Sequence, residues 1–287
     1  MKQSLILFLV AALALTCCTR GSLSKRAGEP SDSLYTEQKA MSIHLSDPDR
    51  ALIIIDSAVI VGNVTDWRAD YLRALVYYGG YQNFDKSKAL CEGLVNTRRF
   101  AHSKWNGENA DSITTMRAWV LLAYLARSMS STAEIIRCAS EAAQMAHALG
   151  DVSEEARMSG LIAETQSKAG LADDAIEQLS KTREKVKSIN SFPGVNAYFS
   201  VSKRLLHVLS DNKRYEEMTT VCDELLERIN HFAEHISQYE GISEGLDLSE
   251  FIDLARGQTY AFLTAAYAEM GNRTEALKNE QLMRQTK

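Results

Sequence analysis

The chain has 287 residues, of which 45% are hydrophobic and 24% charged, and its formal net charge at pH 7 is −5. These values are those of an ordinary soluble protein that is long enough to bury a sizeable core. The mild negative charge gives no support to nucleic-acid binding through a broad basic surface. With 3 Pro and 15 Gly, the composition suits a run of helices joined by short turns.

The first residues have the pattern of a secretory signal. Lys2 precedes an apolar run over residues 5–15, which is too short to span a bilayer comfortably. The run ends in Leu-Thr-Cys-Cys at residues 15–18, which resembles the lipobox of bacterial lipoproteins. The resemblance implies that residues 1–18 hold a lipoprotein signal peptide and that Cys18 carries the lipid. It also implies a domain anchored to a bacterial membrane outside the cytoplasm. The alternative is a plain secretory signal with incidental cysteines.

Residues 19–32 are rich in Gly, Ser and charged side chains and show no apolar period. This composition predicts a flexible tether between the lipid and the domain. No second apolar segment of membrane-spanning length follows in the sequence. Further along, Cys91, Cys138 and Cys222 fall inside helical patterns, where a free cysteine behaves as a small buried apolar residue. A disulfide between Cys91 and Cys138 stays open as an alternative.

From residue 33 to residue 287 the apolar pattern has a helical period, and local chemistry marks several helix ends. Asp47 followed by Pro48 predicts a helix start, because the carboxylate caps the helix and proline lacks the N–H that would be left unpaired. Ser131 with Glu134 has the spacing of a capping box. Glycines predict helix ends, and they are Gly79, Gly80, Gly150 and Gly170.

Three segments are expected to interrupt or lengthen the helices. Residues 191–194, Ser-Phe-Pro-Gly, predict a break between two helix pairs. Residues 96–111 predict a long loop. Residues 229–246 predict a lengthened helix followed by a turn flanked by glycine, after which Asp247 with Glu250 predicts the next helix start.

The clearest pattern lies near the C-terminus, over residues 260–277. Gly271 can adopt the left-handed conformation that ends a helix, and Asn272 with Glu275 has the spacing of a cap that starts the next one. Small Ala276 then allows the second helix to approach the first closely. The apolar stripe of the first helix is formed by Tyr260, Leu263, Thr264 and Tyr267.

This aromatic–small–aromatic–Gly–Ala order is similar to that of a tetratricopeptide (TPR) helix pair, whose period is about 34 residues. It recurs when each pair is aligned on one residue early in its second helix, called the anchor here. The steps between anchors are 36, 48, 40, 43 and 58 residues, so the repeats are uneven. The resemblance implies an all-α fold, a right-handed superhelical solenoid of about six helix pairs over residues 33–287. The anchors are Ala51, Ser87, Ile135, Ala175, Met218 and Ala276.

Residues 46–58 extend the resemblance. An Asp-Pro start followed by Arg-Ala-Leu and Asp-Ser-Ala looks like the first repeat of TPR-rich extracytoplasmic sensor regions of bacterial histidine kinases and related regulators. That resemblance implies a scaffold that binds a protein or peptide partner and has a sensory role in signal transduction. The sequence shows no kinase phospho-acceptor region, catalytic triad, P-loop or dinucleotide fingerprint, so we expect neither an enzyme nor a cofactor.

One motif offers an alternative of another class. His231, Glu234 and His235 have the spacing of the H-x-x-E-H zinc motif, with the two histidines one turn apart on a helix. A hydrolytic zinc site needs a third protein ligand and an open water position. We therefore favour a solvated helix face. A metal-dependent hydrolase and a small-molecule-binding lipoprotein are the two alternatives to a scaffold.

The expected partner-binding surface follows from the TPR resemblance, because the first helix of each pair lines the concave face of such a stack. This surface is basic on a chain that is acidic overall, which favours an acidic segment or a free carboxylate as the partner. The simpler interpretation is that these are solvated charges paired with nearby acids such as Glu155. The candidate residues, from the third to the fifth pair, are Arg117, Tyr124, Arg127, Arg157, Glu164, Lys203 and His207.

Overall fold

The computed structural model describes residues 35–96, 110–242 and 248–286. The predicted signal peptide, the lipid-bearing Cys18 and the tether lie outside the described residues, as does most of the loop expected at residues 96–111. The described residues form twelve α-helices and contain no β-strand. In chain order the helices are α2 (Glu37–Ile43), α3 (Pro48–Ile60), α4 (Asp66–Gly79), α5 (Phe84–Asn96), α6 (Ala110–Ser128), α7 (Thr132–Leu149), α8 (Val152–Ser167), α9 (Ala172–Lys187), α10 (Phe192–Asp211), α11 (Tyr215–Glu234), α12 (Leu248–Glu269) and α13 (Arg273–Gln285).

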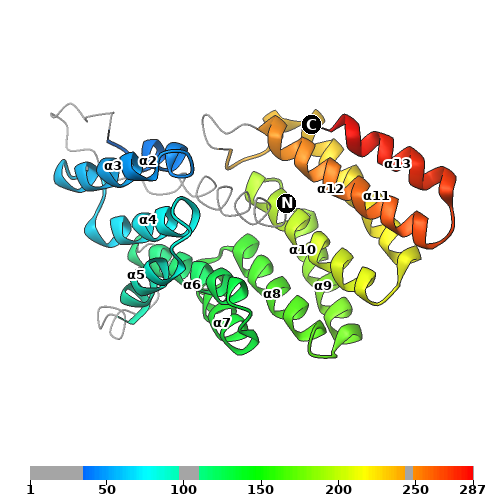
Figure 1. Cartoon of the computed structure of the whole chain (residues 1–287), viewed down its shortest axis with the longest axis horizontal. Coiled ribbons are helices and arrows are strands. Elements are labelled where there is room, and N and C mark those ends of the chain that lie inside the picture. The colour runs from blue at the N-terminus through cyan, green and yellow to red at the C-terminus, as the bar shows by residue number, and fades with distance from the viewer. Residues whose placement is uncertain (1–34, 97–109, 243–247, 287) are drawn as a thin grey trace. The chain divides into compact units, whose positions relative to one another are not determined.

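The chain divides into two compact units, Met1–Asp151 with α2 to α7 and Val152–Lys287 with α8 to α13. Within each unit successive helices fold back on one another (Figure 1). The two helices of every pair, from α2/α3 to α12/α13, pack against each other. Neighbouring first helices also touch, since α4 contacts α2 and α6, and α10 contacts α8 and α12. The predicted all-α fold of helix pairs is confirmed. The right hand of the superhelix stays a prediction.

The anchor of every pair is buried, which confirms the repeat frame. No anchor is more than 9% exposed, and Ala51, Ser87 and Met218 are fully buried. Ser87 is polar, but its Oγ donates to the Ala74 carbonyl of α4 at 2.8 Å, so the hydroxyl is satisfied at the helix contact. The anchors therefore mark the positions where the second helix meets the first.

A left-handed residue forms the turn inside five of the six pairs. It lies five positions before the anchor in each case, and its φ is between 53° and 95°. Only two of the five are glycines, so the sequence predicted Gly170 and Gly271 and missed the others. The five turn residues are Gln82, Ser130, Gly170, Lys213 and Gly271.

The helix starts predicted at Asp47, Ser131 and Asn272 are confirmed, and the start predicted at Asp247 lies outside the described residues. The side chains of Asp47, Ser191 and Asn272 accept from a backbone N–H three residues later. Ser131 stands at the start of α7 but makes no capping hydrogen bond. The predicted capping box fails because the Glu134 carboxylate pairs instead with the Arg137 guanidinium, at 2.7 Å.

The expectation of a lengthened helix over residues 229–246 is wrong beyond the end of α11. A short 3-10 helix, Ile236–Gln238, follows, and the chain then turns back toward the start of α10. The backbone N–H of Phe192 donates to the carbonyl of Glu240 at 2.8 Å, and the N–H of Glu240 donates to the carbonyl of Asn190 at 3.2 Å. Arg228 completes this contact, because its Nη2 donates to the carbonyl of Ile189 at 2.9 Å.

The cores of the two units hold the aromatic residues where the repeat pattern expects them. In the first unit Tyr71 and Tyr78 are 4% and 3% exposed, and Trp119 packs on a small cluster around Met116. In the second unit Tyr260 and Tyr267 pack against the main core. That core also contains a cluster of aromatic side chains near the N-terminal end of α10. The cluster is formed by Phe192, Phe199, Phe232, Tyr239 and Phe251.

Candidate partner-binding site

Three of the seven candidate residues lie on one face of α6 in the first unit. Arg127 is exposed in the last turn of α6, where a cation is favoured by the partial negative charge of the helix C-terminus. Tyr124 is 5% exposed, and Arg117 is half-buried. Burial raises the pKa of the neighbouring Tyr78, and the nearby charge of Arg127 opposes part of this rise. Arg127 is therefore the accessible charge of this group.

Two candidates lie on α8 in the second unit, and both are held by ion pairs. Nη1 of Arg157 is 2.9 Å from Oε2 of Glu154, and both side chains are largely buried. Glu164 pairs with Arg204 of α10, with each side chain 5% exposed, and Nζ of Lys168 lies 3.8 Å from its other oxygen. Glu164 thus joins α8 to α10.

The remaining two candidates lie on α10, beside α12. Lys203 Nζ donates to Oε1 of Gln258 at 3.2 Å. The ring of His207 meets the ring of Phe262 edge-on, with 5.0 Å between centroids. Lys203 is half-buried and His207 is exposed. Both therefore border the contact between these two first helices.

The structure brings together residues that the sequence treated separately. Arg204 and Gln258 were missed, and each ties two first helices of the second unit to one another through Glu164 or Lys203. The charges of Arg157 and Arg204 are balanced by Glu154 and Glu164. The basic character expected of this surface is consequently smaller on α8 than the sequence indicated.

The H-x-x-E-H segment has a geometry of its own. The rings of His231 and His235 stack, with 4.4 Å between centroids. Nδ1 of His231 is 2.9 Å from the hydroxyl of Tyr239, which also accepts from Arg228. His235 lies at the end of α11, and its Nδ1 donates to the His231 carbonyl. Within the described part of the chain, no three His, Cys, Asp or Glu side chains form a group that could hold a metal ion.

Cys91, Cys138 and Cys222 are buried free thiols, as expected from their positions in the helical pattern. In residues 35–96, 110–242 and 248–286, no helix has the length and the apolar character needed to cross a bilayer.

These features define an all-α protein built from helix pairs. No protein-family model matches the chain, and no curated protein sequence does. Among solved structures, the chain is similar to BtubC (BKLC) from P. vanneervenii, whose crystal structure matches with a TM-score of 0.53 at 15% sequence identity. The match covers 87% of this chain and 85% of that one. At this identity the likeness shows the fold alone.

Proposed function

We propose that this protein is a membrane-tethered TPR scaffold, displayed outside the cytoplasm, that binds a protein or peptide partner. The observation that carries the proposal is the repeated helix pair, with a buried anchor in all six pairs and with neighbouring first helices in contact within each unit. Each pair alone buries little surface, and stacked pairs present an extended row of first helices to a partner. The sensory role in signalling belongs to the same proposal and rests on the resemblance of residues 46–58.

Accessible charges suited to the partner lie on first helices of each unit, and in the second unit charges fixed by ion pairs accompany them. Arg157 is held by Glu154 of its own helix, and Arg204 joins α10 to α8 through Glu164. Arg127, Lys203 and His207 are exposed or half-exposed at their helix surfaces. An acidic peptide segment or a free C-terminal carboxylate fits these groups, because charge-assisted hydrogen bonds to Arg and Lys are shorter and stronger than neutral ones.

The test uses immobilised acidic peptides with either a free or an amidated C-terminus, and the full chain in detergent. We expect Lys203→Glu and Arg127→Glu each to weaken binding about tenfold and to reduce its salt dependence. Lys181→Glu is the matched control, because Lys181 lies on the second helix α9 and its side chain is 72% exposed. Unchanged binding of both test variants would show that the first helices do not carry the site.

The tether is tested separately, by replacing the cysteine that the lipobox resemblance selects. Cys18→Ser should release the protein from membranes or leave an unprocessed precursor, because the lipid attachment point is gone. Cys17→Ser is the control and should be processed normally. A Cys18→Ser protein that is cut and fractionates with membranes like the wild type would contradict lipid anchoring.

A further inference from the structure

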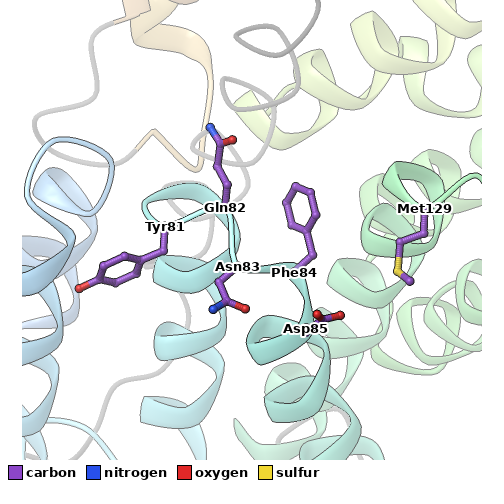
Figure 2. Close-up of a pocket in the computed structure, with 6 residues that line it drawn as sticks. All are labelled: Tyr81, Gln82, Asn83, Phe84, Asp85 and Met129. Atoms are coloured by element: carbon purple, nitrogen blue, oxygen red, sulfur yellow. The ribbon is translucent and has the colours of Figure 1, made fainter.

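A pocket of about 420 Å³ opens beside the turn between α4 and α5 in the first unit. In Figure 2 the ring of Phe84 stands between Gln82 and Met129, and the carboxylate of Asp85 lies below the ring on the side of Met129. Tyr81 and Met129 are 38% and 53% exposed, so the pocket is open to solvent. Its lining is thus mixed, with aromatic and apolar side chains beside two amides and one carboxylate. The lining residues are Tyr81, Gln82, Asn83, Phe84, Asp85 and Met129.

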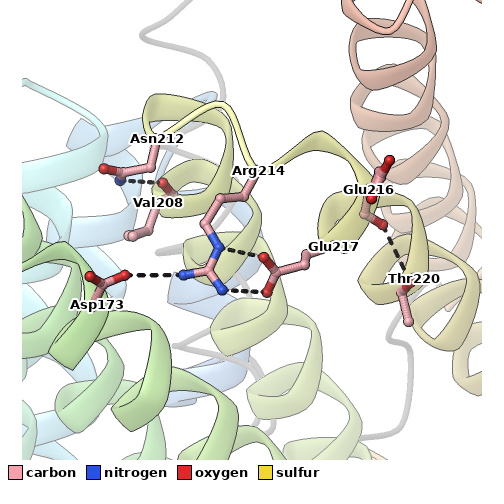
Figure 3. Close-up of polar contacts among 7 residues, drawn as sticks. All are labelled: Asp173, Val208, Asn212, Arg214, Glu216, Glu217 and Thr220. Carbon is pink, nitrogen blue, oxygen red and sulfur yellow. Dashed lines mark hydrogen bonds and ion pairs between the residues drawn. The ribbon is translucent and has the colours of Figure 1, made fainter.

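In the second unit, the turns of the fourth and fifth pairs correspond to the turns beside this pocket, and an arginine lies between them. Counting from the left-handed turn residues, Asp173 of the fourth pair corresponds to Asp85 of the second, and Arg214 of the fifth pair corresponds to Ser131 of the third. Figure 3 shows Arg214 between two carboxylates. Its Nη1 is 3.2 Å from Oδ1 of Asp173, and its Nη2 is 2.7 Å from Oε2 of Glu217. This ion pair links two successive turns.

The first unit keeps the acids of that arrangement and lacks the cation. Glu134 corresponds to Glu217, but it forms an ion pair with Arg137 of its own helix. Ser131 replaces the arginine, and its side chain makes no capping bond. Among the residues that the structure describes, Asp85 forms no ion pair. A carboxylate in this position therefore has room for a positive charge supplied from outside.

The lining also differs in a way that suits an arginine. The fourth and fifth pairs have Ala169, Ala172 and Asn212 at the positions that Tyr81, Phe84 and Met129 occupy in the pocket. Phe84 and Met129 thus stand where the other pairs have shorter side chains, while Tyr81 points away from them and its hydroxyl donates to Asp49 (Figure 2). A planar guanidinium can stack on an aromatic face while it pairs with a carboxylate. A lysine ammonium stacks on aromatic faces less well.

We propose that this pocket binds an arginine side chain of a partner protein. The guanidinium pairs with Asp85, as Arg214 pairs with Asp173, and the face and stem of the arginine lie against Phe84 and Met129. The site goes beyond the proposed function, because it lies at the turns of the pairs and takes a basic group, whereas the first helices are suited to an acidic segment.

The test follows the methyl group of Met129 by NMR in the full chain, labelled with ¹³C at methionine methyls and held in detergent. The probe is N-acetylarginine methylamide, and N-acetylcitrulline methylamide is its neutral analogue of the same shape. We expect a saturable shift of the Met129 signal with the arginine probe and about tenfold weaker binding of the citrulline probe. A Met129 signal that does not move, or that responds equally to both probes, would overturn the proposal.

Variants test how much the Asp85 carboxylate contributes to binding of the arginine probe. Asp85→Asn should weaken binding of the arginine probe about tenfold, whereas Glu141→Gln, at an exposed acid of α7 outside the pocket, should leave it unchanged. Ser131→Arg places an arginine at the position of Arg214. It should fill the pocket from within and reduce probe binding about tenfold. Asp85→Asn binding like the wild type would exclude Asp85 as the partner of the guanidinium.

Discussion

At the scale of single residues, the turns inside the helix pairs carry the clearest backbone strain. Gln82, Ser130 and Lys213 have φ values of 53°, 58° and 58°, a region in which a side chain crowds the backbone. Gly170 and Gly271 occupy the same place in their own turns without that crowding. The same turn is therefore made by strained residues in three pairs and by unstrained ones in two.

Replacing a strained turn residue by glycine should stabilise the protein. We expect Gln82→Gly, Ser130→Gly and Lys213→Gly each to raise the free energy of unfolding by about 0.5–1 kcal/mol, because relief of the left-handed strain exceeds the added entropy of an unfolded glycine. Urea unfolding followed by circular dichroism measures the change.

The matched controls are Gly170→Ala and Gly271→Ala, which should lower the free energy of unfolding by about 1 kcal/mol. No atom lies within 4 Å of a Cβ built at either glycine, so any loss comes from the backbone and not from a clash. If these two variants are as stable as the wild type, the left-handed turn is not what these positions require.

The buried thiols should be unreactive in the folded protein. Burial raises the pKa of Cys138 to about 11, and it also raises the pKa of Cys91 and Cys222. Since only the thiolate attacks, we expect a disulfide reagent at pH 8 to label all three about 100-fold more slowly in buffer than in urea, in a chain carrying Cys17→Ser and Cys18→Ser. Reaction of only one thiol in urea would reveal a Cys91–Cys138 disulfide.

At the scale of single helices, the start of α10 depends on its cap and the start of α7 does not. Ser191 Oγ accepts from the backbone N–H of Gly194 at 3.2 Å, and the Ser131 side chain makes no capping hydrogen bond. We expect Ser191→Ala to lower the free energy of unfolding by about 1 kcal/mol and Ser131→Ala to change it by less than about 0.5 kcal/mol. Thermal unfolding of the two variants, side by side, checks this difference, and equal losses would contradict it.

The helices were largely predictable from the sequence, because each helix has an apolar stripe of helical period and the anchors recur from pair to pair, although at uneven spacing. The left-handed conformation of Gln82, Ser130 and Lys213 was not, since a non-glycine residue gives no sign that it adopts a positive φ. The candidate site was predicted helix by helix. Its cross-links were missed because Glu164 and Arg204 are 40 residues apart, and helical period fixes the face of a residue but not its neighbour on another helix.

At the scale of the whole molecule, each helix pair in a stack of this kind contacts only the pairs next to it. A substitution that destabilises one pair should therefore destabilise only the adjacent pairs. Ala175 is 1% exposed at the contact of α9 with α8, so Ala175→Trp should cost about 1–3 kcal/mol by overpacking. We expect hydrogen exchange to increase mainly in α8 to α10, while α3 to α5 stay protected.

The control for this prediction is Glu177→Trp, because Glu177 is exposed on the same helix. It adds the same side chain without filling a helix contact and should leave exchange unchanged. A uniform loss of protection from α3 to α13 after Ala175→Trp would mean that the chain unfolds as one cooperative block.

The distance from each left-handed turn residue to its anchor is five residues in all five pairs that have this turn, although successive turns are separated by 48, 40, 43 and 58 residues. All variation in length therefore falls outside the turn. One residue inserted between Gly170 and Ala175 would rotate α9 by about 100° and carry its buried face into water. Extra residues in the segment between two pairs do not rotate a second helix relative to its first helix. A reporter peptide or a grafted loop should therefore be inserted in the segments between pairs.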